Sequence, residues 1–249
     1  LPFQPTLLEP EPGPATLKTR PWGGFRLAAL RDPAATVARP IGESWEFSTM
    51  PDSESRTGGR TLSAALGRPL PFLAKLLDTA HELSIQVHPD DDAVPGRIGK
   101  EEAWVVLDAD PGARVLAGLR PGVDRDTFVA AAERVLVDRR DGWELVDLMA
   151  NIPVRTGSVV LVPAGTVHAV GGGILLAEIQ QPADCTLRLF DYGSDRELHV
   201  REAIHAARAE LRPTIWHHGQ PPTRMAGRHL QLDVLAPGVH VRSADHDLL

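Results

Sequence analysis

Cysteine is almost absent from this 249-residue chain, in which Cys185 is the only one. A single cysteine cannot form an intramolecular disulfide, so the fold must be stable without one. This favours a reducing compartment, and we predict a cytoplasmic location. The sequence also has no long apolar run and no basic-then-apolar leader. We therefore expect neither a membrane span nor a signal peptide.

Net positive charge is also missing, because the formal charge is −7 at pH 7. An excess of negative charge argues against nucleic acid or an anionic membrane as the main partner, since both are negatively charged themselves. A small anionic substrate would need a local group of basic residues. Hydrophobic residues make up 43% of the chain, which is ordinary for a globular protein and excludes a disordered one.

Lysine is scarce: among the 26 basic residues only Lys18, Lys75 and Lys100 are lysines, and the rest are arginines. These lysines are either ordinary surface residues or residues retained for a property that arginine lacks. An ammonium group has a tunable pKa and can carry a proton, whereas a guanidinium effectively cannot. A lysine near a candidate site is therefore a candidate proton carrier.

Alternating apolar and polar residues predict a mainly β fold. We expect a helical insertion at about residues 124–150, where Phe128, Ala131 and Val135 recur at helical spacing after a candidate cap at Asp124 or Asp126. Two further helices are expected, at 61–66 with Thr61 as the cap, and at about 198–211. The expected strands are 42–48, 71–78 paired with 83–88, 100–107, 113–119, 158–162, 166–170, 174–181, 186–191, 230–235 and 239–242.

The first candidate site residues are Gln86 and His88, on a predicted strand that stops at Pro89. Residues two apart on a strand share a face, so the two side chains point the same way. A neutral imidazole beside an amide oxygen is half of a divalent-metal site. Taken alone, a structural histidine explains this stretch better. The acidic run at 90–92 is interpreted as a solvated loop.

A second candidate lies in the segment from Gly157 to His168. A glycine, five residues, Pro-x-Gly, two residues and a histidine predict a tight hairpin that presents His168 from a barrel strand. This spacing matches the second signature of the cupin β-barrels. The first cupin signature is altered, since Gln86 replaces its first histidine and the glutamate, Glu102, lies 14 residues beyond His88.

Three motifs in order resemble the type I phosphomannose isomerases: Gln-x-His-Pro from Gln86, Gly-Lys-x-Glu-x-Trp from Gly99, and Pro-x-Gly-x-x-His-Ala from Pro163. The resemblance covers roughly residues 15–208. It implies a cupin jelly-roll barrel and a zinc-dependent aldose–ketose isomerase that interconverts mannose 6-phosphate and fructose 6-phosphate through an enediol.

The resemblance also implies a domain organisation. Residues 1–212 would form the metal-binding cupin domain with its helical insertion. Relatives continue into a second, smaller β-barrel. We therefore expect residues 213–249 to be a linker and the start of a truncated second cupin-like domain.

The family's zinc ligands fall on Gln86, His88, Glu102 and His168, which implies one Zn²⁺ per chain. Two histidines, a carboxylate and an amide oxygen suit a zinc ion with a position left for water or substrate. Such a layout is typical of a catalytic site, and the resemblance implies a sugar phosphate as the partner molecule.

The family's catalytic arginine falls on Arg188, which stands in an apolar strand. Without the resemblance, an ion pair with Asp184 or Asp191 would explain it. Glu178 corresponds to an active-site glutamate of the family.

Lys100 matches the lysine two residues before the metal-ligating glutamate, and Lys75 matches a lysine of an earlier strand. Lys100 and Glu178 are the candidate proton carriers, and nearby zinc is expected to lower the pKa of Lys100. The candidates for binding the phosphate are Lys75, Lys100 and Arg97.

Two other functions stay open. The first is another metal-dependent cupin enzyme, such as a different sugar-phosphate isomerase or an oxygenase, although oxygenases usually hold iron with more histidines. The second is a non-catalytic sugar-binding cupin, which would be expected to lose metal ligands or the arginine that this chain retains.

Overall fold

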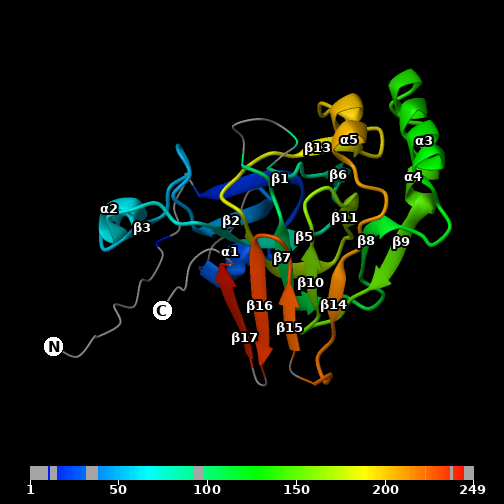
Figure 1. Ribbon diagram of the computed structural model, residues 1–249. Coiled ribbons are helices and arrows are strands. Elements are labelled where there is room, and N and C mark those ends of the chain that lie inside the picture. The colour runs from blue at the N-terminus through cyan, green and yellow to red at the C-terminus, as the bar shows by residue number, and fades with distance from the viewer. Residues whose placement is uncertain are drawn as a thin grey trace.

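Two antiparallel β-sheets face one another in the computed structural model, which describes residue 11 and residues 16–31, 39–91, 93, 98–221, 223–235 and 238–243 (Figure 1). The larger sheet has the strand order β1-β2-β5-β12-β7-β10-β14, and the smaller has β13-β6-β11-β8-β9. The larger sheet contains β1 (Leu17–Gly24), β2 (Ile41–Phe47), β5 (Leu73–Thr79), β12 (Ile174–Gln180), β7 (Glu102–Ala109), β10 (Val159–Val162) and β14 (Thr214–Trp216). The smaller contains β13 (Leu187–Phe190), β6 (Ile85–Val87), β11 (His168–Val170), β8 (Arg114–Leu119) and β9 (Met149–Pro153). The predicted mainly β, cupin-type fold is confirmed.

The space between the two sheets is apolar over part of its length. Trp104, Val160 and Leu176 of the larger sheet pack there against Val115 and Val170 of the smaller one. Alternation along each strand sends every second side chain into this space. Further along the same strands, the inward positions carry polar residues, and these build the candidate site.

Three helices cover the outer face of the smaller sheet: α3 (Arg125–Val137), α4 (Trp143–Leu148) and α5 (Val200–Ala206). The predicted helical insertion is confirmed, and the Asp124 side chain accepts the backbone N–H of Thr127 at 2.8 Å as its N-cap. The last helix is shorter than the predicted 198–211. It ends where the Arg208 N–H donates to the carbonyl of Gly165 instead of continuing the helix.

Two short helices complete the chain's helical part, α1 (Arg26–Arg31) and α2 (Leu62–Leu66). Helix α2 confirms the helix predicted at 61–66, and Gly67 ends it in the left-handed conformation with φ 72°. Thr61 stands at its N-cap position but makes no capping hydrogen bond with its side chain. Just before α2 lie the paired two-residue strands β3 (Arg56–Thr57) and β4 (Arg60–Thr61).

Two predicted hairpins are wrong. Strand β5 belongs to the larger sheet and β6 to the smaller, so segments 71–78 and 83–88 do not pair. Likewise β10 and β11 lie in different sheets, and the Pro163–Gly165 turn carries the chain across between them. In double-sheet jelly rolls consecutive strands often switch sheets. Local alternation does not say which strand becomes the neighbour.

A third sheet, with the order β15-β16-β17, lies against the outer face of the larger sheet (Figure 1). Its strands are β15 (Thr223–Ala226), β16 (Leu230–Leu235) and β17 (Gly238–Ser243), so the two predicted strand-like runs near the C-terminus are confirmed. Met225 and Leu232 pack there on Ala103, Val159 and Leu161. The division into domains at residue 212 stays a prediction. Among the described residues no helix has the length and apolar character to cross a membrane.

Candidate metal centre and adjoining cavity

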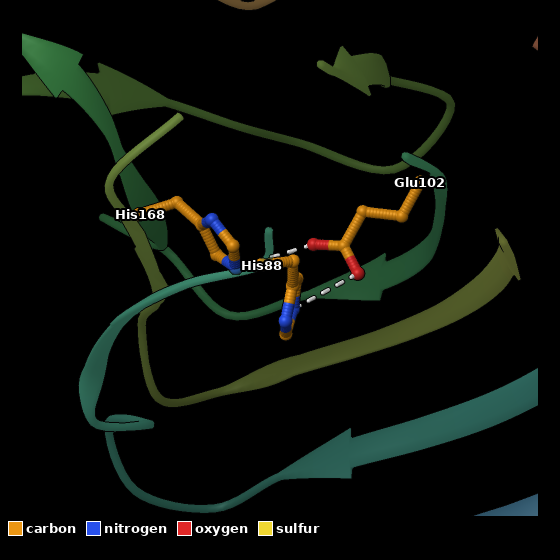
Figure 2. A group of neighbouring side chains, drawn as sticks. All are labelled: His88, Glu102 and His168. Atoms are coloured by element: carbon orange, nitrogen blue, oxygen red, sulfur yellow. Dashed lines mark ion pairs between the residues drawn. The ribbon is translucent and has the colours of Figure 1, made fainter. Parts of the chain in front are cut away.

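Three buried side chains, His88, Glu102 and His168, meet between the sheets (Figure 2). Glu102 begins β7, His168 begins β11, and His88 directly follows β6. The His88 Nε2 lies 3.4 Å from Glu102 Oε2, and the His168 Nε2 lies 3.2 Å from Glu102 Oε1. Each residue is 1% exposed. Two imidazoles and one carboxylate thus present one donor atom each to a common point.

Backbone carbonyls hold both imidazole rings from behind. The His88 Nδ1 lies 2.7 Å from the carbonyl of Cys185, and the His168 Nδ1 lies 2.8 Å from that of Thr166. Since a carbonyl only accepts, each Nδ1 carries the hydrogen, and each Nε2 has a lone pair that can accept a hydrogen bond or bind a metal. Such contacts orient metal-ligating histidines.

Both histidines are held neutral. Burial, and then the charge of Lys100, lowers the pKa of His88 to about 4. Burial likewise lowers the pKa of His168, against the opposing charge of Glu102. A neutral imidazole is the form that binds a metal, so neither ring needs to lose a proton near neutral pH.

The donor set fits a divalent cation. Glu102 Oε1 is buried and has no hydrogen-bond donor among the described residues. The two imidazoles do not supply one, because each turns an unprotonated Nε2 towards the carboxylate. Such an arrangement of acceptors is stable only with a cation nearby. Lys100 supplies one such charge, with its Nζ 2.5 Å from Glu102 Oε2 and 2.9 Å from His88 Nε2. Two nitrogens and a carboxylate oxygen are ligands that Zn²⁺ accepts.

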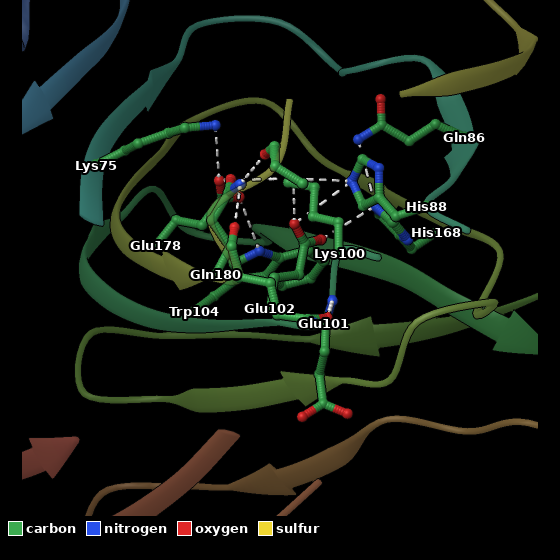
Figure 3. A network of polar contacts seen from close by, with 12 residues as sticks. Lys75, Gln86, His88, Lys100, Glu101, Glu102, Trp104, His168, Glu178 and Gln180 are labelled. Carbon is green, nitrogen blue, oxygen red and sulfur yellow. Dashed lines mark hydrogen bonds and ion pairs between the residues drawn. The ribbon is translucent and has the colours of Figure 1, made fainter. Parts of the chain in front are cut away.

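Gln86 adjoins this group from β6, where its cross-strand partners are His168 and Arg188 (Figure 3). Its Nε2 lies 3.3 Å from His168 Nε2, and Ser84 Oγ donates to its Oε1 at 3.2 Å. As a metal ligand it would use the oxygen, which a half-turn of the amide brings to the same place.

Lys75, Lys100 and Glu178 form a buried chain of charges beside the group (Figure 3). Glu178 Oε1 lies 3.3 Å from the Nζ of Lys75 and 3.7 Å from that of Lys100, and Trp104 Nε1 donates to Glu178 Oε2 at 3.3 Å. Burial would lower the pKa of Lys100, but the charges of Glu102 and Glu178 outweigh burial and raise it. The predicted lowering of this pKa refers to the site with zinc bound and stays a prediction.

Arg188 faces inward from β13 and is half-buried. Neither of its proposed ion-pair partners is used: Asp191 pairs with Arg196, and no Arg188–Asp184 ion pair occurs among the described residues. The Nε of Arg188 is buried without a hydrogen-bond partner in that part of the chain. Burial, and then the charge of Arg196, lowers the pKa of Arg188, although a guanidinium stays charged.

A cavity of about 470 Å³ opens beside these groups. This volume is in the range of small-molecule sites. Its walls include Gln86 and four of the predicted catalytic or substrate-binding residues, Lys75, Lys100, Glu178 and Arg188. Arg97, a candidate for binding phosphate, lies outside the described residues.

Two further basic residues of the cavity wall were not predicted from the sequence, Arg20 and Arg196. Arg196 begins an Arg-Glu-Leu-His block within the segment 15–208 that the resemblance covers, which was a usable signal. Arg20 reaches the cavity from β1 and offered no motif. With Lys75, Lys100 and Arg188 they make the local group of basic residues that an anionic substrate needs in a chain of net charge −7.

Glu43, which also lines the cavity, is held ionised by its neighbours. Arg20 Nε and Trp45 Nε1 donate to its two oxygens at 2.8 and 2.7 Å. Burial alone would raise the pKa of Glu43, but the charges of Lys75 and Arg20 and these hydrogen bonds lower it to about 2, from an ordinary value of 4.5.

This shift predicts a pH-dependent stability. Since the folded-state pKa of Glu43 lies below the unfolded one, the stabilisation is fully present above about pH 4.5 and is lost as the pH falls from there towards 2. In the variant Glu43→Gln the side chain at this position cannot ionise, so this contribution is absent at every pH. The difference in free energy of unfolding between wild type and variant should therefore shrink by about 2 kcal/mol from pH 6 to pH 3. Urea unfolding at both pH values measures it, and a constant difference would contradict the assignment.

Comparison with known proteins gives one family throughout. A model described as the catalytic domain of type I phosphomannose isomerase matches residues 49–102. Mannose-6-phosphate isomerase ManA of Bacillus subtilis is 34% identical over 214 residues, which are 75% of this chain and 64% of the relative. The probable mannose-6-phosphate isomerase GmuF of the same organism is 32% identical, over 80% of this chain and 67% of its own length. The chain thus spans about two thirds of these relatives.

Solved structures agree in fold. The crystal structure of the mannose 6-phosphate isomerase from Bacillus subtilis aligns with a TM-score of 0.72 at 26% identity, covering 93% of this chain and 77% of that one. A structure described as mannose 6-phosphate isomerase bound with zinc and yttrium aligns with a TM-score of 0.57 at 16% identity, covering 92% of this chain and 80% of that one. At 16% identity this likeness shows a common fold and nothing more.

Proposed function

Since the chain belongs to the type I phosphomannose isomerase family, we propose that it is a zinc-dependent isomerase that interconverts mannose 6-phosphate and fructose 6-phosphate. One observation carries this proposal. The His88–Glu102–His168 group adjoins a cavity whose walls include Lys100, Glu178 and Arg188. A metal-ligand set, titratable groups and a guanidinium beside one space can together carry out an aldose–ketose isomerisation.

In this proposal His88, Glu102 and His168 hold one zinc ion per chain, with Gln86 as the fourth ligand. The buried Glu102 Oε1 without a donor among the described residues, and the two unprotonated Nε2 atoms that face the carboxylate, support it. When bound, the ion would supply a Lewis acid that stabilises negative charge developing on a substrate oxygen.

The chain's own residues would do the remaining work. Isomerisation moves a proton between C1 and C2 through an enediol, and negative charge develops on an oxygen. The guanidinium of Arg188, which has no carboxylate partner in the described part of the chain, can hydrogen-bond to that oxygen. Lys100 and Glu178 adjoin each other and are assigned to proton transfer and to contact with the sugar hydroxyls.

The phosphate is assigned to the basic part of the cavity wall. Lys75 is the proposed contact, supported by its buried position there and by its cation–π contact with Trp45, 4.9 Å from the ring centroid, which holds the ammonium in place. We also propose a cytoplasmic location, on the grounds of a single cysteine and a sugar-phosphate substrate.

Two measurements test the proposed function. Metal analysis of the purified chain should find one zinc per chain, and removal of zinc by a chelator should abolish turnover. A coupled assay should detect conversion of mannose 6-phosphate to fructose 6-phosphate. Zinc without turnover would favour a sugar-binding cupin, and iron with oxygen consumption would favour an oxygenase. Either result would overturn the isomerase.

A further inference from the structure

Glu101 stands between two site residues but points away from them (Figure 3). Lys100 and Glu102 face the space between the sheets, and Glu101 lies on the opposite side of the chain, as alternation requires. It is nevertheless only 1% exposed. The cavity and the metal centre make no use of this buried carboxylate.

The carboxylate of Glu101 binds the turn between β15 and β16. Its Oε2 accepts the backbone N–H of Arg228 at 2.9 Å, and its Oε1 accepts those of His229 and Leu230 at 2.9 and 2.7 Å. Hydrogen bonds to an ionised acceptor are stronger than neutral ones. Gly227 completes the fit, because a Cβ at that position would collide with the same carboxylate.

The same turn also contacts the segment that follows His88. Arg228 Nη1 lies 2.9 Å from Asp90 Oδ2, and His229 Nε2 lies 3.6 Å from Asp90 Oδ1 and 3.5 Å from Asp91 Oδ2. Asp90 and Asp91 are therefore not simply a solvated loop. One turn of the outer sheet thus contacts two segments, each within three residues of a candidate metal ligand.

We propose that the turn 227–230 is a positioning element of the metal centre and that Glu101 is the positioning residue through which it acts. The turn holds the residue before Glu102 and the residues after His88 in one fixed relation. The inference rests on the proposed function for the identity of the ion. Its structural part, the immobilisation of the start of β7, stands without the ion.

Small displacements matter at such a site, because metal–ligand distances tolerate only about 0.2 Å. If Glu101 loses its partners, the backbone carrying Glu102 can move relative to His88. The outer sheet should nevertheless stay docked, because Met225, Leu230 and Leu232 remain packed on Ala103, Val159 and Leu161. Loss of positioning can therefore be separated from loss of fold.

Two variants break the contact from opposite sides. Glu101→Gln replaces one acceptor oxygen by an amide nitrogen, so at least one N–H of the turn loses its acceptor. Gly227→Ala leaves Glu101 intact and pushes the turn away from it. The matched control is Arg224→Ala, which breaks the Arg224–Asp233 ion pair inside the same sheet and leaves the turn's contacts in place.

Zinc affinity, measured by competition with a chelating dye, is the main measurement. The dissociation constant should rise about tenfold in both test variants and stay at the wild-type value in the control, since changes behind the ligands typically cost about 10- to 100-fold. Backbone amides of residues 100–106 should exchange hydrogen faster in the metal-free test variants than in the metal-free wild type.

The inference is overturned if both test variants keep the wild-type zinc affinity and exchange rates, even with a lower Tm, because the turn would then only stabilise the docked sheet. Failure of the proposed function is recognised separately. If the chain binds zinc without isomerising mannose 6-phosphate, zinc affinity still tests the role of the turn. If it binds no zinc, the hydrogen exchange of the backbone amides still tests it.

Discussion

His168→Ala should lose the metal and, with it, measurable turnover. The substitution removes one of three donor atoms that converge between the sheets and leaves the buried Glu102 carboxylate with one imidazole. Since changes behind a ligand already weaken metal binding about 10- to 100-fold, loss of a direct ligand should weaken it by more than about 100-fold. His88→Ala should behave in the same way. Zinc content after dialysis, together with coupled turnover, measures both effects.

Gln86→Ala provides the internal ranking. A neutral amide is the poorest donor of the four, so its loss should weaken zinc binding less than loss of either histidine. His205→Ala, on α5 and outside the group, is the matched histidine control and should retain the metal. Equal zinc content in the Gln86, His88 and His168 variants would contradict the ranking, and a full complement in His168→Ala would refute the assigned ligand set.

Arg188→Ala should retain zinc and thermal stability but lose about 10²-fold or more in turnover, the scale of one lost charge-stabilising donor. Stability should hold because the guanidinium has no ion pair among the described residues, so its removal breaks none. Arg188→Lys should rescue poorly, since a point charge cannot reproduce a planar fork of donors. Coupled kinetics, zinc analysis and thermal unfolding together test this.

Arg134→Ala is the matched arginine control for that experiment. Arg134 lies on the exposed face of α3, where it pairs with Asp141 and Glu144 at 3.0 and 3.2 Å. Its loss should leave turnover unchanged, because Arg134 does not line the cavity. The protein should also stay folded, because surface ion pairs contribute about 1 kcal/mol or less to stability. Near-normal turnover in Arg188→Ala would remove Arg188 from the reaction, and a large drop in Tm would give it a structural role.

Several elements could be predicted from local pattern alone. Alternation identified strands such as β7 and β12, and helical spacing after Asp124 identified α3, because each signal lies within one short segment. The strand partners could not be predicted in this way. Whether β5 is followed by a strand of its own sheet or of the other one depends on sheet twist and loop paths, which leave no mark in the alternation.

For the candidate site, too, some features could be predicted from the sequence and others could not. Sequence by itself determined which residue types are present, and the family resemblance indicated which of them belong together: Gln86, His88, Glu102, His168 and Arg188. Only the tertiary structure decided their electrostatic state. Asp191 pairs with Arg196, which leaves Arg188 without that partner, and the carboxylates of Glu102 and Glu178 adjoin Lys100 and raise its pKa. The turn against Glu101 was likewise invisible, since its partners lie more than 120 residues away. Charge acts through space, so a pKa or an ion pair depends on neighbours that only the folded chain brings together.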